Sequence, residues 1–230
     1  MHRDDDSIDF SAVLGSAVHD MKNSLCLIMQ SIENLGKSLT ETDQLSRDNL
    51  ASAHYEAARL NTGLVQLLCL YRTRLNNLPL NIDEYDIQDV IGDLLATNKN
   101  YLNHKNMSLE VSQSVDIIWY LDADLIGILL NDVLINAMRY GQQKILLSVY
   151  TKNEQLVFKV EDDGPGYPKS MLDAHKISMQ DCDISQGRTG LGLFFARLIA
   201  QAHSKGDNKG DVSLKNGGSL GGSVFVLTLP

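Results

Sequence analysis

The first third of the chain carries two series of apolar residues whose spacing is that of packed helices. In both series the apolar positions alternate between steps of four and three residues, as in the helices of a coiled-coil-like bundle. The stretch 36–42 separates the two series, so the sequence predicts an antiparallel helical hairpin. The positions are Leu14, Val18, Met21, Leu25, Ile28, Ile32 and Leu35 in the first series, and Leu50, Ala53, Ala57, Leu60, Leu64, Leu67 and Tyr71 in the second.

One such hairpin cannot bury both of its apolar stripes. Two copies paired about a twofold axis would form a four-helix bundle and cover them, so we expect a homodimer with C2 symmetry. The alternative, that the hairpin packs against the rest of its own chain, stays open at this point.

The secondary-structure pattern of the sequence changes after residues 76–79 (Asn-Asn-Leu-Pro). The proline there disfavours helix at the residue before it. Helical and strand patterns then alternate, which predicts a helical layer on one face of a mostly antiparallel sheet. We therefore assign the chain to the α+β class, with domains at 1–77 and 78–230. Helices are expected at 87–102, at 122–140 with Asp122 as N-cap, and at 187–200; strands are expected at 108–111, 116–120, 144–150, 155–161, 212–214 and 223–229.

The composition narrows the class of protein further. A net charge of −9 argues against nucleic acid as the main partner. The three cysteines lie far apart without paired spacing, which argues against a disulfide framework and against a zinc site. No apolar run approaches the roughly 20 residues that span a bilayer, and the first residues lack a signal core. We therefore expect a cytoplasmic chain without a membrane span.

Three short motifs in the second part of the chain suit a nucleotide. The stretch 187–192 (Gly-Arg-Thr-Gly-Leu-Gly) precedes an apolar helix, where glycines let backbone N–H groups approach phosphates. The stretch 162–166 (Asp-Asp-Gly-Pro-Gly) follows a strand and offers a carboxylate acceptor beside a turn. The stretch 136–140 (Asn-Ala-Met-Arg-Tyr) ends a predicted helix. Each is weak alone, because glycine turns and a surface asparagine are ordinary features.

A fourth motif, at residues 19–23 (His-Asp-Met-Lys-Asn), precedes these three. In order and approximate spacing, the four motifs resemble the H, N, G1 and G2 boxes of a two-component sensor histidine kinase. The resemblance covers residues 14–230. The resemblance implies a HisKA-type dimerisation and phosphoacceptor domain that forms a dimeric four-helix bundle. A GHKL-type ATP-binding domain would follow, an α/β sandwich of the histidine kinase, gyrase and Hsp90 type.

The resemblance also implies roles for the residues of the ATP site. Asp162 would accept a hydrogen bond from the adenine amino group, while Gly164 and Gly166 shape the loop beneath the base. Asn136 would bind Mg²⁺ through its side-chain oxygen, which suits a hard cation that bridges nucleotide phosphates. The remaining site residues expected from the resemblance are Arg139 on the phosphates, Tyr140 beside the base, and Gly190, Leu191 and Gly192 at the helix start.

In the same way, His19 is implied as the phosphoacceptor, attacking through Nε2 while Asp20 holds the Nδ1–H. Asn23 lies one helical turn away and would orient the water that dephosphorylates a response regulator. The implied activity is that of an ATP-dependent protein-histidine kinase that passes the phosphoryl group to an aspartate of a receiver domain. Because few residues precede His19, we expect a separate sensor protein to act in trans.

Two departures from the family pattern bear on this interpretation. Asp132 stands where these kinases usually carry a second asparagine; it could bind Mg²⁺ or water, or act as a general base on water. The stretch 170–186, where the ATP lid is expected, lacks the usual phenylalanine-bearing box. Two alternatives are therefore kept: a non-catalytic phosphotransfer or scaffold protein with a degenerate ATP-binding domain, and an ATPase or serine kinase that does not use His19.

Overall fold

A computed structural model describes residues 10–38, 46, 49–50, 52–54, 56–58, 60–64, 80–114, 116–173 and 191–230. The chain divides into two compact units, Met1–Asn77 and Leu78–Pro230. The division falls at the residue where the sequence pattern places its domain boundary.

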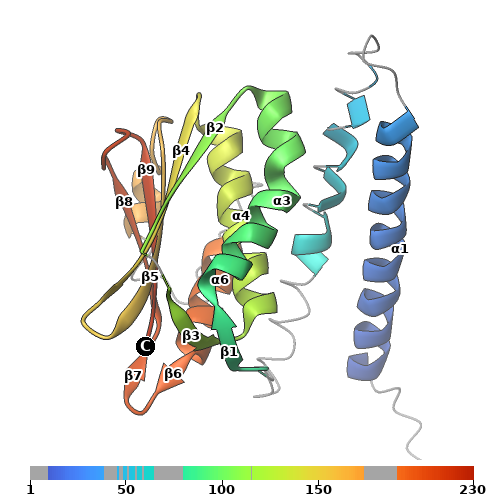
Figure 1. Ribbon diagram of the computed structural model, residues 1–230. Coiled ribbons are helices and arrows are strands. Elements are labelled where there is room, and N and C mark those ends of the chain that lie inside the picture. Colours follow the sequence, from blue (N-terminus) through green and yellow to red (C-terminus); the bar gives the residue numbers. More distant parts are fainter. Residues whose placement is uncertain are drawn as a thin grey trace, which may run out of the picture. The chain divides into compact units, whose positions relative to one another are not determined.

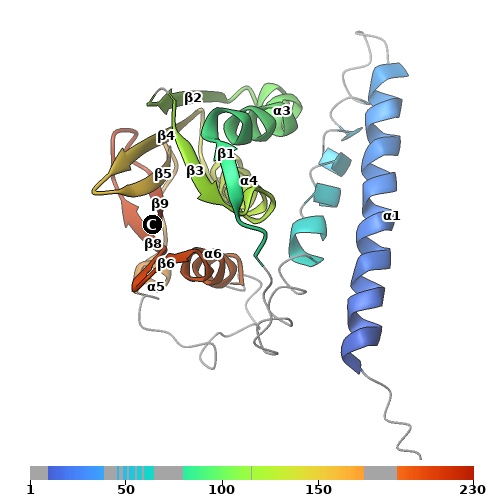
Figure 2. The ribbon, with the colours of Figure 1, turned by 60° about the horizontal axis from the view of Figure 1, so that its bottom comes forward.

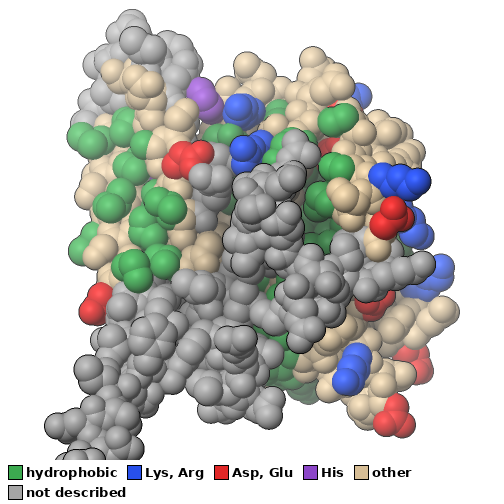
Figure 3. Space-filling model, turned by 180° about the vertical axis from the view of Figure 1, so that it is seen from behind, with side chains coloured by type: hydrophobic (Ala, Val, Ile, Leu, Met, Phe, Trp, Pro, Cys, Tyr) green, Lys and Arg blue, Asp and Glu red, His purple; other side chains and the backbone are tan. Residues whose placement is uncertain are grey.

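The first unit contains a long helix, α1, at Phe10–Ser38, which confirms the first predicted helix. Every described residue between 46 and 64 is also helical, whereas residues 65–79 of the second predicted helix lie outside the described part. Three residues of the first apolar series, Met21, Ile28 and Leu35, are 45%, 49% and 56% exposed on α1. Figure 3 shows hydrophobic side chains gathered along this helix. Their exposure leaves an apolar stripe in water, the condition that bundle formation would remove.

The second unit is a five-stranded sheet with three helices on one face (Figures 1 and 2). The strand order is β2-β4-β5-β9-β8; β2 runs parallel to β4, and all other pairs are antiparallel. The predicted helical layer on a mostly antiparallel sheet is thus confirmed. The strands are β2 Ser108–Gln113, β4 Lys144–Lys152, β5 Gln155–Asp162, β8 Asp211–Asn216 and β9 Ser223–Leu229; the helices are α3 Ile87–Lys105, α4 Ala123–Tyr140 and α6 Leu191–Ala202.

The core lies between the sheet and the helical layer. Helix α4 packs against α3 and α6, and it contributes Ile126, Leu130 and Leu134, all at most 1% exposed and spaced four residues apart. Phe158 of β5 and Phe195 of α6 are buried to the same degree. Helix α4 is therefore held on its whole apolar side, which fixes the direction of the polar residues at its end.

Two small ribbons and one short helix complete the unit. Strand β1, Asp83–Asp86, pairs with β3, Ile118–Leu121; β6, Ser204–Lys205, pairs with β7, Asn208–Lys209; and α5 spans Lys169–Leu172. The sequence analysis missed β1, β6 and β7. It also began β3 two residues early, because Asp116 adopts a φ of 57° that interrupts the extended backbone.

Among the described residues, no helix combines the length and apolar character required to cross a lipid bilayer.

Candidate nucleotide-binding site

The predicted adenine-binding carboxylate, Asp162, is the last residue of β5 and only 4% exposed. Its Oδ1 accepts hydrogen bonds from the backbone N–H of Gly164 (2.8 Å) and of Ser223 (3.2 Å). Its Oδ2 accepts a hydrogen bond from the hydroxyl of Ser223. A buried carboxylate with several donors on it is held in one orientation. It retains acceptor capacity, since a carboxylate offers about four lone-pair positions.

The next residue, Asp163, ties this turn to the end of α4. Its carboxylate accepts hydrogen bonds from the backbone N–H groups of Gln142 (2.7 Å), Gln143 (3.0 Å) and Lys144 (3.0 Å). Burial alone would raise the pKa of Asp163, but these hydrogen bonds outweigh burial and lower the pKa below its ordinary value. The carboxylate therefore fastens the loop between α4 and β4 to the end of β5.

The two glycines of this turn are required by close contacts. A Cβ on Gly164 would run into the backbone carbonyl of Tyr140, the last residue of α4. Gly166 has a φ of 82°, and a Cβ there would lie 2.8 Å from the carboxamide of Asn216. That carboxamide accepts from the N–H of Tyr167 (2.7 Å) and donates to the Tyr167 carbonyl (2.9 Å). Asn216 thus clamps the backbone of the turn.

The end of α4 brings the residues of the predicted N box to the same place. Asn136, Arg139 and Tyr140 are exposed, and Asp132 lies one turn earlier and is partly buried. Steps of three and four residues put all four on one side of the helix. The guanidinium of Arg139 lies 5.4 Å from the ring centroid of Tyr140, a cation–π distance. Because the Tyr140 backbone lies close to Gly164, the C-terminal end of α4 adjoins the Asp162 turn.

The G2 residues are described only in part. Leu191 is the first residue of α6, and Gly192 follows it within the helix, partly buried. Gly190 and most of the expected lid lie outside the described residues. Helix α6 packs against α4, and the N-terminus of α6 and the C-terminus of α4 carry the predicted motifs.

The sequence analysis missed Ser223 and Tyr167. Ser223 begins β9 after Gly222, whose N–H donates to the Asp162 carbonyl (3.1 Å). Two glycines before the serine could have suggested a close backbone approach. Burial and the nearby charge of Asp162 raise the pKa of Tyr167 to about 12, although a hydrogen bond with Ser223 acts in the opposite direction. Tyr167 is therefore close enough to Asp162 for its ionisation to depend on the charge of that carboxylate.

Glu161 supports the loop that delivers Ser223. It is 1% exposed, accepts from the N–H (2.8 Å) and hydroxyl (3.2 Å) of Ser219, and pairs with the ammonium of Lys159 at 2.6 Å. Burial alone would raise the pKa of Glu161, but Lys159 and Ser219 outweigh it and lower the pKa. Glu161 and Asp162, adjacent on β5, thus hold two points of the same β8–β9 loop.

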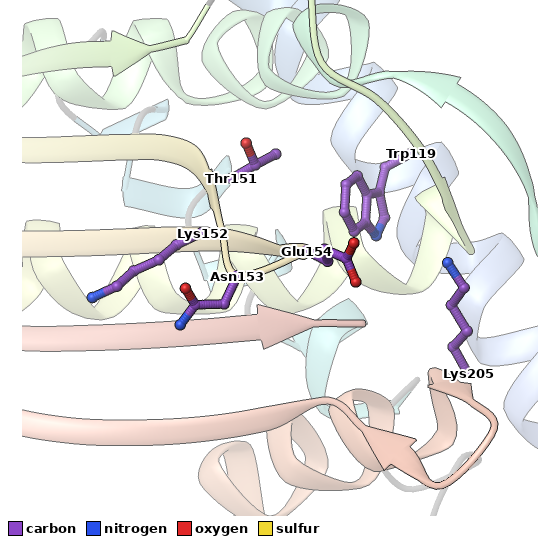
Figure 4. A pocket seen from close by; sticks show the side chains of 6 residues that line it. All are labelled: Trp119, Thr151, Lys152, Asn153, Glu154 and Lys205. Carbon is purple, nitrogen blue, oxygen red and sulfur yellow. The ribbon is translucent and has the colours of Figure 1, made fainter.

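A separate pocket lies at the other end of β5, beside the β4–β5 turn (Figure 4). It has a volume of about 470 Å³ and contains none of the predicted site residues. Because a whole strand separates it from Asp162, it is distinct from the nucleotide site. Its lining residues are Trp119, Thr151, Lys152, Asn153, Glu154 and Lys205.

The predicted phosphoacceptor region lies on α1. Asp20 and Asn23 are exposed, and the hydroxyl of Ser24 donates to the backbone carbonyl of Asp20 at 3.0 Å. For His19 the helical backbone is described and the side chain is not. His19 and Asn23 are one turn apart on a continuous helix and therefore share a face.

The polar groups of the Asp162 turn and of the end of α4 fit a nucleotide with a divalent cation. A buried carboxylate suits an amino group on a base, a guanidinium suits phosphate, and an amide oxygen suits Mg²⁺ bound mainly through phosphates. Residues 121–230 match the family model described as histidine kinase-, DNA gyrase B- and HSP90-like ATPases. This part of the second unit is thus similar to that family. The match begins at the last residue of β3 and contains Asn136, Asp162, Gly192 and Ser223.

Matches to other proteins cover more of the chain than that domain. The chain is 25% identical over 228 residues to the sensor protein KdpD of Clostridium acetobutylicum, a match covering 96% of this chain and 24% of KdpD. It is 22% identical over 226 residues to the sensor protein SrrB of Staphylococcus aureus, covering 94% of this chain and 37% of SrrB. The chain is thus similar to these two sensor proteins along nearly its whole length, and it spans 24% of KdpD and 37% of SrrB.

Solved structures show the same fold. The Acinetobacter baumannii histidine kinase AdeS superposes with a TM-score of 0.58 at 22% identity, covering 90% of this chain and 95% of the AdeS chain. The catalytic domain of histidine kinase ThkA superposes with a TM-score of 0.53 at 19% identity, covering 65% of this chain and 96% of that domain.

Proposed function

We propose that this protein is an ATP-dependent protein-histidine kinase that phosphorylates itself on His19 and passes the phosphoryl group to an aspartate of a response regulator. The observation that carries the proposal is the Asp162 turn. There a buried, fixed carboxylate lies in a turn that touches the end of α4, the helix that carries the exposed amide, guanidinium and aromatic side chains. Retention of this whole arrangement favours a working nucleotide site over a degenerate one.

In this proposal, Asp162 accepts a hydrogen bond from the exocyclic amino group of adenine. Guanine carries a carbonyl oxygen at the equivalent position, so its acceptor would face the carboxylate and be repelled. Tyr140 lies beside the base, Arg139 binds phosphate, and Asn136 supplies an oxygen to Mg²⁺. Bound Mg²⁺ neutralises charge on the phosphates. Gly190, Leu191 and Gly192 would contribute backbone N–H groups to the phosphates at the start of α6.

His19 attacks the γ-phosphorus through Nε2, so that an N–P bond forms and the bond to the departing ADP breaks. Asp20 accepts the Nδ1–H of His19, which fixes the reactive tautomer and stabilises the positive ring that results. Positioning and electrostatics supply most of the acceleration in phosphoryl transfer. The exposure of Asp20 and Asn23 on α1 supports a surface that a receiver domain can reach.

Asn23 extends the proposal to a second activity. On the face shared with His19, its carboxamide would orient a water molecule against the phosphoaspartate of a docked receiver domain. The enzyme would then be a kinase and a phosphatase by turns, acting in the cytoplasm on the same regulator. The exposed apolar residues of α1 support a homodimer in which the helical hairpins of two copies form a four-helix bundle.

Incubation of the full chain with γ-labelled ATP and Mg²⁺ tests the proposal. Acid-labile, base-stable label is expected on the wild type and absent from His19→Gln and Asn136→Ala. His54→Gln is the matched control, since His54 is a second histidine on a helix of the first unit, and it should label normally. A wild type that neither labels nor binds nucleotide would favour the non-catalytic phosphotransfer protein instead.

A further inference from the structure

A polar junction joins three distant parts of the second unit: the exposed Asn81 and the buried Asp122 and His203. Asp122 is 5% exposed and His203 is 3% exposed, so neither side chain is a surface feature. Asn81 lies in the segment that leads from the first unit into the second. Burying a polar group without a hydrogen bond costs folding free energy, so the loss of any hydrogen bond at this junction should destabilise it.

Asp122 makes three different contacts. Its Oδ1 accepts from the N–H of Leu125 (3.0 Å), which caps the N-terminus of α4. Its Oδ2 accepts from the N–H of Asn81 (2.9 Å), which holds the connecting segment. Its own backbone N–H donates to Nε2 of His203 (3.0 Å). One residue thus links the start of α4 to the connecting segment and to the end of α6.

His203 follows the last residue of α6, and its ring is fixed at both nitrogens. Because Nε2 accepts from the Asp122 N–H, Nε2 carries no proton. The proton is therefore on Nδ1, which lies 2.8 Å from the carbonyl of Ile199 and donates to it. The hydrogen-bond partners define a single neutral tautomer.

The junction is placed at the ends of α4 and α6 that lie away from the nucleotide residues. Asn136 and Tyr140 are at the C-terminal end of α4, and Leu191 and Gly192 are at the N-terminal end of α6. Asp122 precedes α4, whereas His203 follows α6. The two packed helices are therefore fastened together at one end, and the predicted nucleotide contacts are at the other.

We propose that Asp122 and His203 are positioning residues that form a pin between α4 and α6. This pin sets the spacing of the two helices at the nucleotide site, and the segment joining the two units acts on it through Asn81. The inference rests on the proposed nucleotide site for its functional consequence. Asn136 lies about 21 Å from the pin along α4 at 1.5 Å per residue, so a tilt of about 5° would displace it by about 2 Å. Displacements of about 1 Å can change reaction rates about 100-fold.

The link to the connecting segment is tested with Asp122→Ser in the full chain. Serine also caps helices, but it has no second oxygen for Asn81, so the cap is retained and the link is lost. Affinity for Mg²⁺-ATP, measured by calorimetry, should fall about threefold to tenfold, the usual size of coupling between linked sites. Asp86→Ser is the matched control: Asp86 caps α3 in the same way, through Gln88, and α3 carries no nucleotide residue. It should leave the affinity unchanged.

The pin itself is tested with a pair of amides at position 203. In His203→Gln the side-chain oxygen can reach the N–H of Asp122, whereas in His203→Asn the shorter side chain can serve only the Ile199 carbonyl. Gln should keep the affinity within about threefold of the wild type, and Asn should weaken it about tenfold. His203→Leu fills the site without either hydrogen bond, so it should weaken the affinity as much as His203→Asn, whereas a role in packing alone would keep it close to His203→Gln. In the wild type, ¹⁵N spectra of the imidazole should show the proton on Nδ1.

Three results would overturn the inference. An Nε2-protonated ring would remove the bond to Asp122, whatever the protein binds. Equal affinities for all variants, with a wild type that binds ATP, would show that the pin does not act on the site. A wild type that binds no adenine nucleotide would instead reject the proposed function, and the role assigned to the pin with it.

Discussion

The hydroxyl of Ser223, at the start of β9, donates a hydrogen bond to the buried carboxylate of Asp162, at the end of β5. The backbone N–H of Ser223 bonds the other oxygen of the same carboxylate at 3.2 Å. The antiparallel pairing of β5 and β9 brings these residues together across 61 positions of sequence. The carboxylate proposed to bind adenine is therefore oriented by a strand that carries none of the recognisable motifs.

Ser223→Ala should weaken ATP binding and relax selectivity for adenine. The variant leaves Oδ2 of Asp162 without its hydroxyl donor, and a lost hydrogen bond to a charged group costs roughly 1.5–3 kcal/mol. Calorimetric titration with ATP and GTP measures both effects. Ser213→Ala, on the neighbouring strand β8, is the control and should bind like the wild type. An unchanged preference for ATP over GTP would contradict the role given to Ser223.

Gly166→Ala should destabilise the second unit by about 1–3 kcal/mol. Alanine at a φ of 82° is strained, and its Cβ would press on the carboxamide of Asn216. The same substitution at Gly127, inside α4 with open space around it, should stabilise the protein by roughly 0.5–1 kcal/mol. Urea unfolding of the two variants should therefore give shifts of opposite sign. A shift of the same sign would mean that the turn is not constrained as described.

Asp163→Asn should lower stability at neutral pH, because an amide oxygen cannot replace a carboxylate that receives three backbone N–H groups. The expected loss is about 1–3 kcal/mol. The folded pKa of Asp163 is lowered, so its contribution is present above the unfolded pKa, near 3.9. It disappears as the pH falls through the folded value. Denaturation curves of wild type and variant should therefore converge in acid and separate towards neutral pH.

Much of the second unit could be predicted because its signals are local. Asp122 caps α4 three residues before its partner Leu125, and the apolar period of α4 is visible in sequence. The strand β1 could not be predicted, because Asp83–Asp86 is an acidic tetrapeptide that becomes a strand only by pairing with the distant strand β3. The parallel pairing of β2 with β4 is non-local in the same sense.

The candidate site divides along the same line. Asp162, Gly164 and Gly166 are adjacent in sequence, and their spacing could be recognised. Ser223 and Asn216 reach the turn only through the fold, from the two strand ends that flank a loop with its own short glycine run. The residue types and spacings of a motif show which groups one segment supplies to a site. They do not show which distant side chains hold that segment in place.

Tyr167→Phe should reduce the loss of stability at high pH. The folded pKa of about 12 exceeds the unfolded value of about 10. The contribution of neutral Tyr167 is therefore complete below pH 10 and is lost as the pH rises towards 12. At 1.36 kcal/mol per unit, this amounts to roughly 2–3 kcal/mol. Urea unfolding between pH 9 and 12 measures it. Tyr150→Phe, on strand β4, is the matched control and should keep the wild-type pH profile.

Asn23→Ala should separate the two proposed activities. Autophosphorylation requires His19, Asp20 and the nucleotide site, none of which is changed by the substitution. Dephosphorylation of the regulator requires a water molecule held against the phosphoaspartate, and the methyl group of alanine cannot orient it.

Label on His19 should therefore stay within about twofold of the wild type, while phosphate release from a labelled receiver domain should fall by about 10²-fold, the lower range for a positioned polar catalyst. Asn34→Ala is the matched control, because Asn34 is an exposed asparagine on the same helix, well beyond the His19 region. It should leave both activities intact. Equal loss of labelling and phosphatase activity in Asn23→Ala would show that Asn23 supports the helix or the kinase step. The assignment of a separate hydrolytic role would then be wrong.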